Sequence, residues 1–177
     1  MSKISKRKNL RLKGYDYSSP NVYFITICSF DRKNLFGHIF NGVMRLNENG
    51  NIVRNEWLRT TIARDNVKLD KFVIMPNHIH GIVIINGKSS RGVLQYAPTN
   101  RLRSPSQTIG AIIRGFKSTT TKQINILRKT PKKPIWQRNY YEHIIRNEKD
   151  LNEICEYIIN NPQKWDLDKE NLGTLTP

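Results

Sequence analysis

Two histidines separated by a single residue are the feature of this sequence with the clearest chemical potential. His78 and His80 stand in the run MPNHIHGIVII, whose branched apolar residues predict a strand over 78–85. Alternate side chains of a strand share a face, so both imidazoles would point one way while Ile79 points into the core. Two imidazoles held like this can bind one metal ion, although a histidine pair can also be an ordinary part of a strand surface.

Further ligands for such an ion can be sought in the last part of the chain. Asn161 offers a side-chain carbonyl oxygen, and oxygen ligands favour Mg²⁺ or Mn²⁺, whereas imidazole ligands alone favour zinc or another late transition metal. Glu142 and His143 are alternative ligands. Because Asn161 precedes Pro162, it is equally typical of a helix C-cap.

A tyrosine near Asn161 could act as a nucleophile, since a phenol can attack a phosphate that a metal ion polarises. Tyr157 lies on a predicted helix, roughly 130° from the centre of the apolar stripe, so it is not an obvious core residue. Asn161 follows one helical turn later on the same face. Tyr140 and Tyr141 are rivals by residue type, but their apolar neighbours favour packing or base stacking.

The charge of the chain predicts a polyanionic partner. Thirty basic residues face 14 acidic ones, a formal net charge of +16, which a ribosomal protein, a repressor or a nuclease could equally carry. Each basic side chain could also belong to a merely solvated surface. The candidate nucleic-acid contacts are Lys6, Arg7, Lys8, Arg101, Arg103, Arg114, Lys117 and Arg138, with Trp136 and Tyr140 as rings that could stack on bases.

Periodic apolar residues predict the elements that position these side chains. Strands are expected over 21–30, 37–46, 71–74 and 78–85, and an extended segment over 136–146. Helices are expected over 52–62, from a capping box at Ser104 through 124, and from an Asn147 cap to Asn161, with a polar loop over 86–103. We therefore expect an α+β fold, with helices packed on a mainly antiparallel sheet.

One domain is expected, over 21–165, between a basic N-terminal tail of residues 1–20 and a C-terminal tail of residues 166–177. Cys28 and Cys155 have no spacing typical of a disulfide framework or a zinc site, which indicates a reduced compartment. The sequence has no run of about 20 apolar residues that could cross a bilayer. A cytoplasmic protein that does not contact membranes is therefore expected.

Four ordered motifs, MPNHIHGIV, GAIIRGFKSTTTKQIN, WQRNYYEHIIRNEKDL and EYIINNPQKW, resemble the single-tyrosine transposases of the His-hydrophobe-His superfamily. Within that superfamily the chain is most similar to the REP-associated tyrosine transposases, from about residue 21 to 165. The resemblance implies a ferredoxin-like antiparallel sheet flanked by helices, with the histidines on a central strand and the tyrosine on a C-terminal helix.

The resemblance also implies an activity, in which His78 and His80 bind Mg²⁺ or Mn²⁺ and Tyr157 cuts and rejoins single-stranded DNA through a 5′-phosphotyrosine. Insertion-sequence relatives carry a glutamine as third ligand four residues after the tyrosine, where this chain has Asn161. The implied partner is single-stranded or hairpin DNA in the bacterial nucleoid. Insertion-sequence relatives are dimers and the REP-associated branch need not be, so a monomer and a homodimer both stay open.

Two other functions fit parts of the pattern. A host-adapted protein that binds DNA hairpins without cutting them would carry the same charge, and cleavage of a labelled strand with manganese separates the two. A cupin-like metal enzyme also carries a His-x-His strand, but its pattern needs a nearby glutamate and a strand-rich barrel, which this sequence lacks.

Overall fold

The computed structural model describes residues 20–87 and 108–171, and a four-stranded sheet lies at its centre. The strands run in the order β4-β5-β1-β6, and every neighbouring pair is antiparallel. The strands are β1 (Asn21–Cys28), β4 (Val67–Ile74), β5 (His78–Ile85) and β6 (Tyr141–Ile145). The helices are α1 (Glu48–Ile62), α2 (Ile109–Leu127) and α3 (Glu148–Asn160). The predicted α+β fold, with helices packed on an antiparallel sheet, is confirmed.

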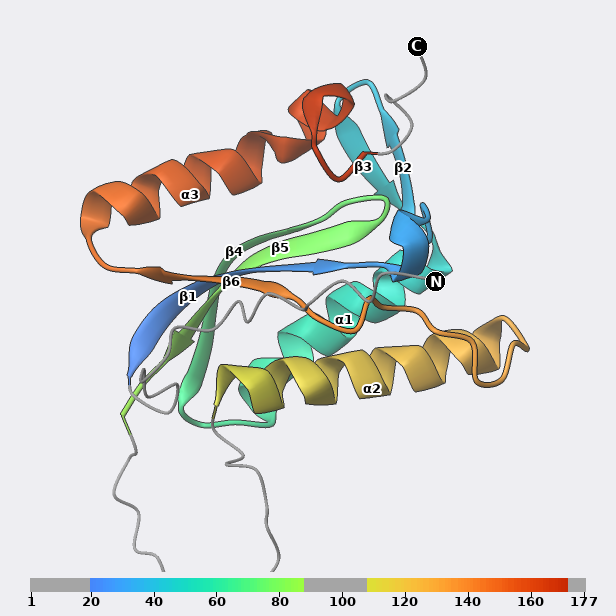
Figure 1. Ribbon diagram of the computed structural model, residues 1–177, viewed down its shortest axis with the longest axis horizontal. Helices are drawn as coiled ribbons and strands as arrows, with labels where there is room; N and C mark the ends of the chain where they lie inside the picture. The colour runs from blue at the N-terminus through green and yellow to red at the C-terminus, as the bar shows by residue number, and fades with distance from the viewer. Residues whose placement is uncertain (1–19, 88–107, 172–177) are drawn as a thin grey trace, which may run out of the picture.

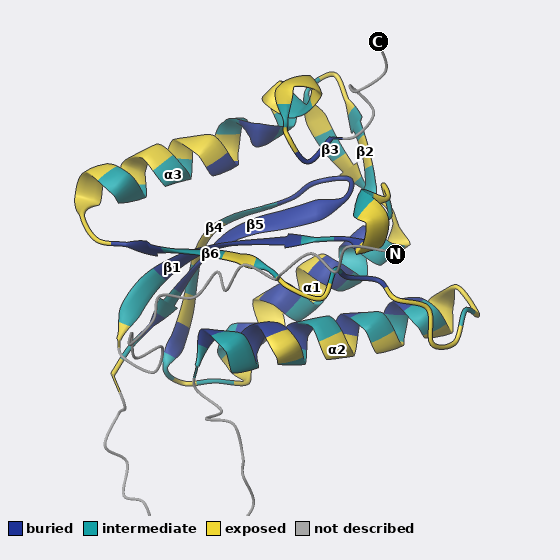
Figure 2. Ribbon diagram, viewed as in Figure 1, coloured by how far each residue is buried: buried dark blue, intermediate teal, exposed yellow. Residues whose placement is uncertain are grey.

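The two faces of the sheet are covered differently, with α1 and α2 on one side and α3 on the other (Figure 1). Tyr23, Ile25 and Ile27 of β1 point to the first side, into a large core that α1 and α2 complete. Phe24 points to the second side, where a smaller core reaches Ile158 of α3. This division follows from the alternation of side chains along each strand. Figure 2 shows β1 and β5 mostly buried between the layers.

Two predicted strands differ from the observed ones for local reasons. The segment 37–46 is a hairpin of β2 (Gly37–Phe40) and β3 (Val43–Leu46), because Asn41 and Gly42 adopt positive φ angles of 49° and 70° and reverse the chain. β4 begins at Val67, four residues before the predicted start. A register shift between Leu69 and Phe72 breaks the apolar alternation on which the prediction relied.

The helix starts show which capping predictions were right. Asn147 caps α3 by accepting a hydrogen bond from the Asp150 amide at 2.9 Å, as predicted. Thr108 caps α2, accepting from the Ala111 amide at 3.2 Å, so the helix that the structure describes does not begin at Ser104. The Ser104 capping box itself lies outside the described residues.

A 3₁₀ helix, η2 (Asn161–Leu167), extends the end of α3 and tolerates Pro162 in its first turn. The chain therefore stays packed against the rest of the protein after Asn161-Pro162. Asp168 and Glu170 contact His78 and Asn77 at the start of β5, and Glu170 and Asn171 are buried. A second short 3₁₀ helix, η1 (Phe30–Arg32), follows β1. Within the described ranges, the helices are too short or too polar to cross a bilayer.

Candidate active site

His78 and His80 lie at the start of β5, on the sheet face that α3 covers. Opposite them in the register of β1 are Cys28 and Thr26. Ile79 points into the large core and is fully buried, so the predicted alternation is confirmed. Both histidines are themselves buried, at 0% and 1% exposure, and their Nε2 atoms are 2.9 Å apart. They are therefore not residues of an ordinary strand surface.

Neighbouring groups orient both imidazole rings through their Nδ1 atoms. His78 Nδ1 lies 2.7 Å from Asn77 Oδ1, and because an amide oxygen can only accept, Nδ1 must carry the proton. His80 Nδ1 lies 2.8 Å from the Thr26 hydroxyl oxygen. The lone pair of His78 Nε2 is thus directed toward the space shared with His80, which is the arrangement of a metal-binding imidazole.

Burial keeps both imidazoles neutral, which is the protonation state that binds metals. It lowers the pKa of His78 below its usual value, although the Asp168 carboxylate opposes this effect. Burial lowers the pKa of His80 still more clearly, and the neighbouring His78 and Lys169 add to the shift. Because His78 is neutral, its contact with Asp168 is not an ion pair.

Asp168 completes a group of three side chains that could hold a metal ion. Its Oδ2 atom lies 3.8 Å from His78 Nε2, and the ligand atoms of His78, His80 and Asp168 all lie within 4.8 Å of one another. The Asp168 side chain is 3% exposed, and Oδ2 has no hydrogen-bond partner among the described residues. Asn161 is also buried, and its Oδ1 is likewise without a hydrogen-bond partner there.

Asp168 was not among the ligands predicted from the sequence, because residue 168 was expected to lie in a C-terminal tail. The available signal was the run Asp166, Asp168 and Glu170, three acids at alternate positions in a strongly basic chain. Of the alternative ligands, Glu142 pairs with Ile25 in the sheet and so lies on the opposite face. His143 is on the right face, but its Nε2 contacts Asp150 on α3 at 2.8 Å.

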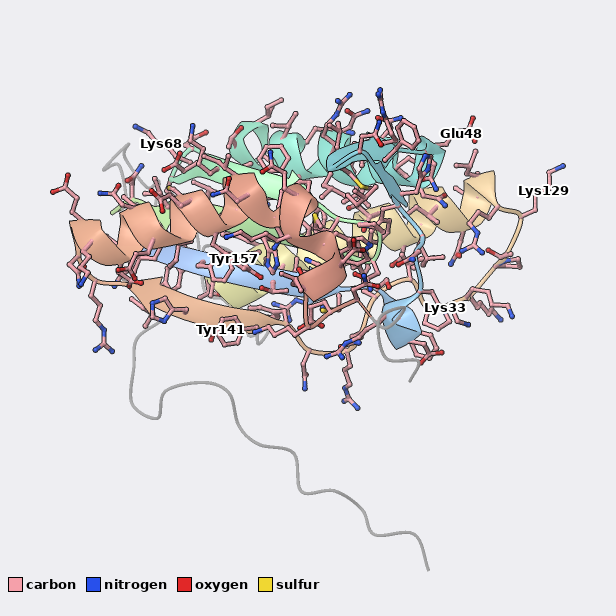
Figure 3. The ribbon with its side chains drawn as sticks, turned by 90° about the horizontal axis from the view of Figure 1, so that it is seen from above. Lys33, Glu48, Lys68, Lys129, Tyr141 and Tyr157 are labelled. Carbon is pink, nitrogen blue, oxygen red and sulfur yellow. The ribbon has the colours of Figure 1, made fainter. Side chains whose placement is uncertain are left out.

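Tyr157 reaches the histidines from α3. Its hydroxyl oxygen is 3.1 Å from His80 Nε2, and its ring packs edge-on against Phe24 with centroids 6.1 Å apart. Burial, with a contribution from the Asp168 carboxylate, raises the pKa of the phenol to about 12, while a hydrogen bond with Asn161 opposes the rise. Figure 3 shows Tyr157 over the middle of the sheet and Tyr141 nearer the molecular edge.

The other residues that could supply a nucleophile are placed differently. Tyr141 is half-exposed on the edge strand β6, where its ring packs against Phe24. Tyr140 packs partly against the large core. Cys28 contacts the Glu170 carboxylate at 3.4 Å, and burial together with that carboxylate raises the pKa of the thiol to about 12, so it stays protonated.

A cavity of about 650 Å³ opens beside the histidines and Tyr157. Phe24, Tyr140 and Tyr141 give it aromatic walls. Its lining also includes three cations, Arg32, Lys164 and Lys169, two carboxylates, Asp168 and Glu170, and four amide side chains, Gln137, Asn139, Asn160 and Asn161. The combination of rings, amides and positive charge suits an unpaired nucleotide with its phosphate.

The structure sorts the predicted nucleic-acid contacts into three groups. Lys6, Arg7, Lys8, Arg101 and Arg103 lie outside the described residues. Arg114 and Arg138 are exposed. Lys117 is half-buried, and its ammonium donates to the carbonyl oxygens of Gln137 at 2.9 Å and Asn139 at 2.8 Å, so it orders the cavity wall.

Trp136 is a correction to the predicted contacts. Its side chain packs against Phe36 and Phe116 in the large core, and the residue is only 7% exposed. The indole N–H donates to the Thr120 hydroxyl at 2.8 Å. A base could stack on this ring only if the core opened, so base stacking by Trp136 does not fit the structure.

Comparison with known proteins finds a protein of similar sequence and a solved structure of similar fold. No family model matches the chain. An uncharacterized protein of Haemophilus influenzae is 44% identical over 170 residues, which cover 94% of this chain and 93% of that protein. The chain belongs to the family of this protein.

A solved structure of a REP-associated tyrosine transposase bound to a REP hairpin resembles the present one over 94% of this chain and 77% of that chain. The TM-score is 0.58 and the sequence identity is 21%. The fold implied by the four sequence motifs is therefore confirmed.

Proposed function

We propose that this chain is a metal-dependent endonuclease and strand transferase that cuts and rejoins single-stranded DNA through Tyr157. The observation that carries the proposal is the position of the phenol: its oxygen lies 3.1 Å from His80 Nε2, which lies 2.9 Å from His78 Nε2. A nucleophile and two neutral metal-binding imidazoles thus converge from a helix and a strand that are far apart in the sequence.

The residues of the site fit a divalent cation. His78, His80 and Asp168 would hold it, with Asn161 as a further oxygen ligand, and the unpartnered buried oxygens of Asp168 and Asn161 support this set. The carboxylate and amide oxygens favour Mg²⁺ or Mn²⁺ over ions that prefer nitrogen and sulfur ligands. When bound, the cation supplies Lewis acidity that polarises the scissile phosphate.

Tyr157 would form a covalent bond from its phenolic oxygen to the phosphorus of that phosphate. The phenol would give up its proton as the bond from phosphorus to the 3′ oxygen breaks. The 3′ oxygen would take up a proton and leave as a hydroxyl, so the protons balance and a 5′-phosphotyrosine remains. Attack of a 3′-hydroxyl on the phosphotyrosine reverses these events. The bond energy is stored in the adduct, so rejoining needs no external energy source.

A DNA partner is supported by the distribution of charge along the chain. Residues 71–141 contain 13 lysines and arginines and no aspartate or glutamate. This segment therefore supplies most of the net charge of +16 that the whole chain carries. At the end of α2 and in the segment that follows, Arg128, Lys129, Lys132 and Lys133 are exposed. This basic surface is suited to phosphates, and the transposase of similar fold was solved with a REP hairpin, so we propose hairpin DNA as the substrate.

The test of the proposed function is covalent capture. Tyr157→Phe keeps the ring and removes the attacking oxygen. The variant should still bind hairpin DNA on a native gel, but it should form no covalent adduct with the DNA when Mn²⁺ or Mg²⁺ is present. Tyr141→Phe, a matched loss of a hydroxyl from the same cavity, should still form the adduct. On a denaturing gel, only the fragment downstream of the cut should migrate with the protein.

The metal ligands are tested in the same assay. His78→Ala and His80→Ala should abolish the adduct and leave DNA retention intact, since retention rests on phosphate contacts elsewhere. An adduct that persists in Tyr157→Phe and disappears in Tyr141→Phe would transfer the nucleophile to β6. Retention without an adduct in wild-type protein, under either metal, would favour the hairpin-binding function that does not cut.

A further inference from the structure

We propose that Asn77 is a positioning residue that acts on both sides of His78: it fixes the tautomer of the imidazole and anchors the segment that carries Asp168. The proposal rests on the metal site of the proposed function. Asn77 lies in the turn between β4 and β5 and is 1% exposed. Neither its position before the paired histidines nor the comparisons assign it a role.

Both the nitrogen and the oxygen of the Asn77 amide have hydrogen-bond partners. Its Nδ2 donates to the backbone carbonyls of Glu170 at 2.7 Å and of Arg32 at 3.0 Å. Its Oδ1 lies 2.7 Å from His78 Nδ1. Because backbone carbonyls can only accept, these two bonds fix which end of the amide faces the imidazole. Asn77 therefore presents an acceptor to His78, and the ring proton resides on Nδ1.

The tautomer decides whether His78 can bind a metal ion. A neutral imidazole carries one N–H, and the nitrogen without the proton is the ligand. If the proton moved to Nε2, it would point at His80 Nε2, only 2.9 Å away, and no lone pair would remain there for a cation. An acceptor opposite Nδ1 prevents that arrangement.

The same amide anchors the chain segment on the other side of the site. The Glu170 amide N–H donates to Asp168 Oδ1 at 2.7 Å. The other oxygen, Oδ2, has no hydrogen-bond partner among the residues that the structure describes, and it lies 3.8 Å from His78 Nε2. The contacts thus form a closed circuit from His78 through Asn77, Glu170 and Asp168 back to His78. Arg32 also contacts this segment, because its Nε atom lies 2.9 Å from the carboxylate oxygen Oε2 of Glu170.

Two substitutions separate the two roles of Asn77. Asn77→Asp keeps the shape and an acceptor oxygen for His78, but a carboxylate cannot donate to the carbonyls of Glu170 and Arg32. Asn77→Ala removes the acceptor and both donors. Asn47→Ala is the matched control, because Asn47 also bonds the backbone, accepting from Gly50 and donating to Leu35, but at the start of α1.

The experiment uses the full chain without DNA and takes Mn²⁺ alone as the probe. Nitrogen chemical shifts of the metal-free protein should show the Nδ1–H tautomer of His78 in wild type, Asn77→Asp and Asn47→Ala, and its loss in Asn77→Ala. Electron paramagnetic resonance measures free Mn²⁺ and so gives the Mn²⁺ affinity of each variant. Relative to wild type, this affinity should be weakened on the order of 10–100-fold in Asn77→Ala and unchanged in Asn47→Ala.

A double-mutant cycle tests the anchor. Asn77→Asp should weaken Mn²⁺ binding in wild type but add no further loss in an Asp168→Ala background, since its effect passes through Asp168. Additive losses, or an Asn77→Ala affinity within about twofold of wild type, would overturn the proposal. Wild-type protein that binds no Mn²⁺ would instead overturn the metal site of the proposed function, and the nitrogen shifts would still decide the tautomer.

Discussion

Single atoms at the site have unmet bonding capacity that a cation would satisfy. Asp168 Oδ2 and Asn161 Oδ1 are buried with no hydrogen-bond partner among the described residues. An unsatisfied buried polar atom costs about 1–3 kcal/mol, and more when it is charged. The histidines add lone pairs to the same space. The site is therefore an unfavourable arrangement for a protein alone and a favourable one around a divalent ion.

This leads to a prediction about metal binding and stability. Mn²⁺ at 100 times its dissociation constant should stabilise the folded state by about 2.7 kcal/mol, because it binds only the assembled site. For a chain of this size that corresponds to a rise in Tm of about 5–10 °C, measurable by scanning calorimetry. Asp168→Asn should abolish most of the rise. The control, Asp166→Asn, changes an exposed neighbouring carboxylate and should keep it.

A second residue-scale prediction concerns the titration of Tyr157. Because burial raises the pKa of its phenol to about 12, Tyr157 should ionise later than an ordinary tyrosine in the metal-free protein. The folded state holds this proton more tightly than the unfolded state, so the stability that it contributes is present below pH about 10 and is lost as the pH rises toward 12.

Ultraviolet absorbance of tyrosinate would measure this titration. The difference between wild-type and Tyr157→Phe curves should show a single group with its midpoint near 12. If the tyrosine lost in Tyr157→Phe titrates near the ordinary value of about 10, the phenol is not buried between α3 and the sheet as the structure shows.

At the scale of elements, sequence periodicity was informative wherever it was regular. The continuous run of branched apolar residues predicted the limits of β5, and the strand geometry predicted the shared face of the histidines. The apolar stripe and the Asn147 cap predicted α3. The break in β4 and the hairpin over 37–46 were missed because a bulge and a tight turn are single-residue events inside apolar runs. Asp168 was missed because only a tertiary contact brings η2 back to β5.

Gly50 shows how tertiary context reverses a helix propensity. Replacing a glycine inside a helix with alanine ordinarily gains about 1 kcal/mol. At Gly50 an added Cβ would lie 2.1 Å from the Phe36 carbonyl oxygen, which is backbone and cannot move aside easily. Gly50 thus permits the close approach of α1 to residue 36.

We therefore predict opposite signs for two glycine substitutions in helices. Gly50→Ala should lower the free energy of unfolding by about 1–3 kcal/mol, the usual cost of overpacking. Gly115→Ala on α2 should be neutral or stabilising, because its Cβ would meet only the flexible end of the Arg64 side chain, at 3.3 Å. Urea unfolding of both variants measures the difference, and equal effects would contradict the contact at Gly50.

At the scale of the whole molecule, the basic surface after α2 should contribute to DNA affinity in proportion to its charge. Changing Lys129, Lys132 and Lys133 together to glutamine should weaken hairpin binding and reduce the slope of log affinity against log salt by up to about 3, because each phosphate contact contributes roughly 0.9. Fluorescence anisotropy over a salt series measures both quantities.

The matched control removes three positive charges from another part of the surface. Arg54 of α1 with Lys68 and Lys71 of β4 are exposed, and Lys68 and Lys129 lie at opposite ends of the molecule in Figure 3. Their change to glutamine lowers the net charge equally. Equal loss of affinity in both triple variants would mean that hairpin DNA responds to total charge and not to the surface after α2.

The central place of β1 has a consequence for the time course of folding. β1 lies between β5 and β6, so Thr26 pairs with His80 and with Tyr141, partners far along the sequence. Each pairing closes a long loop before any contact compensates for the lost chain entropy. The chain should thus fold slowly for its size. Because Asp168 also contacts His78 across a long loop, and both histidines stand on a strand of this sheet, the metal site should assemble late in folding.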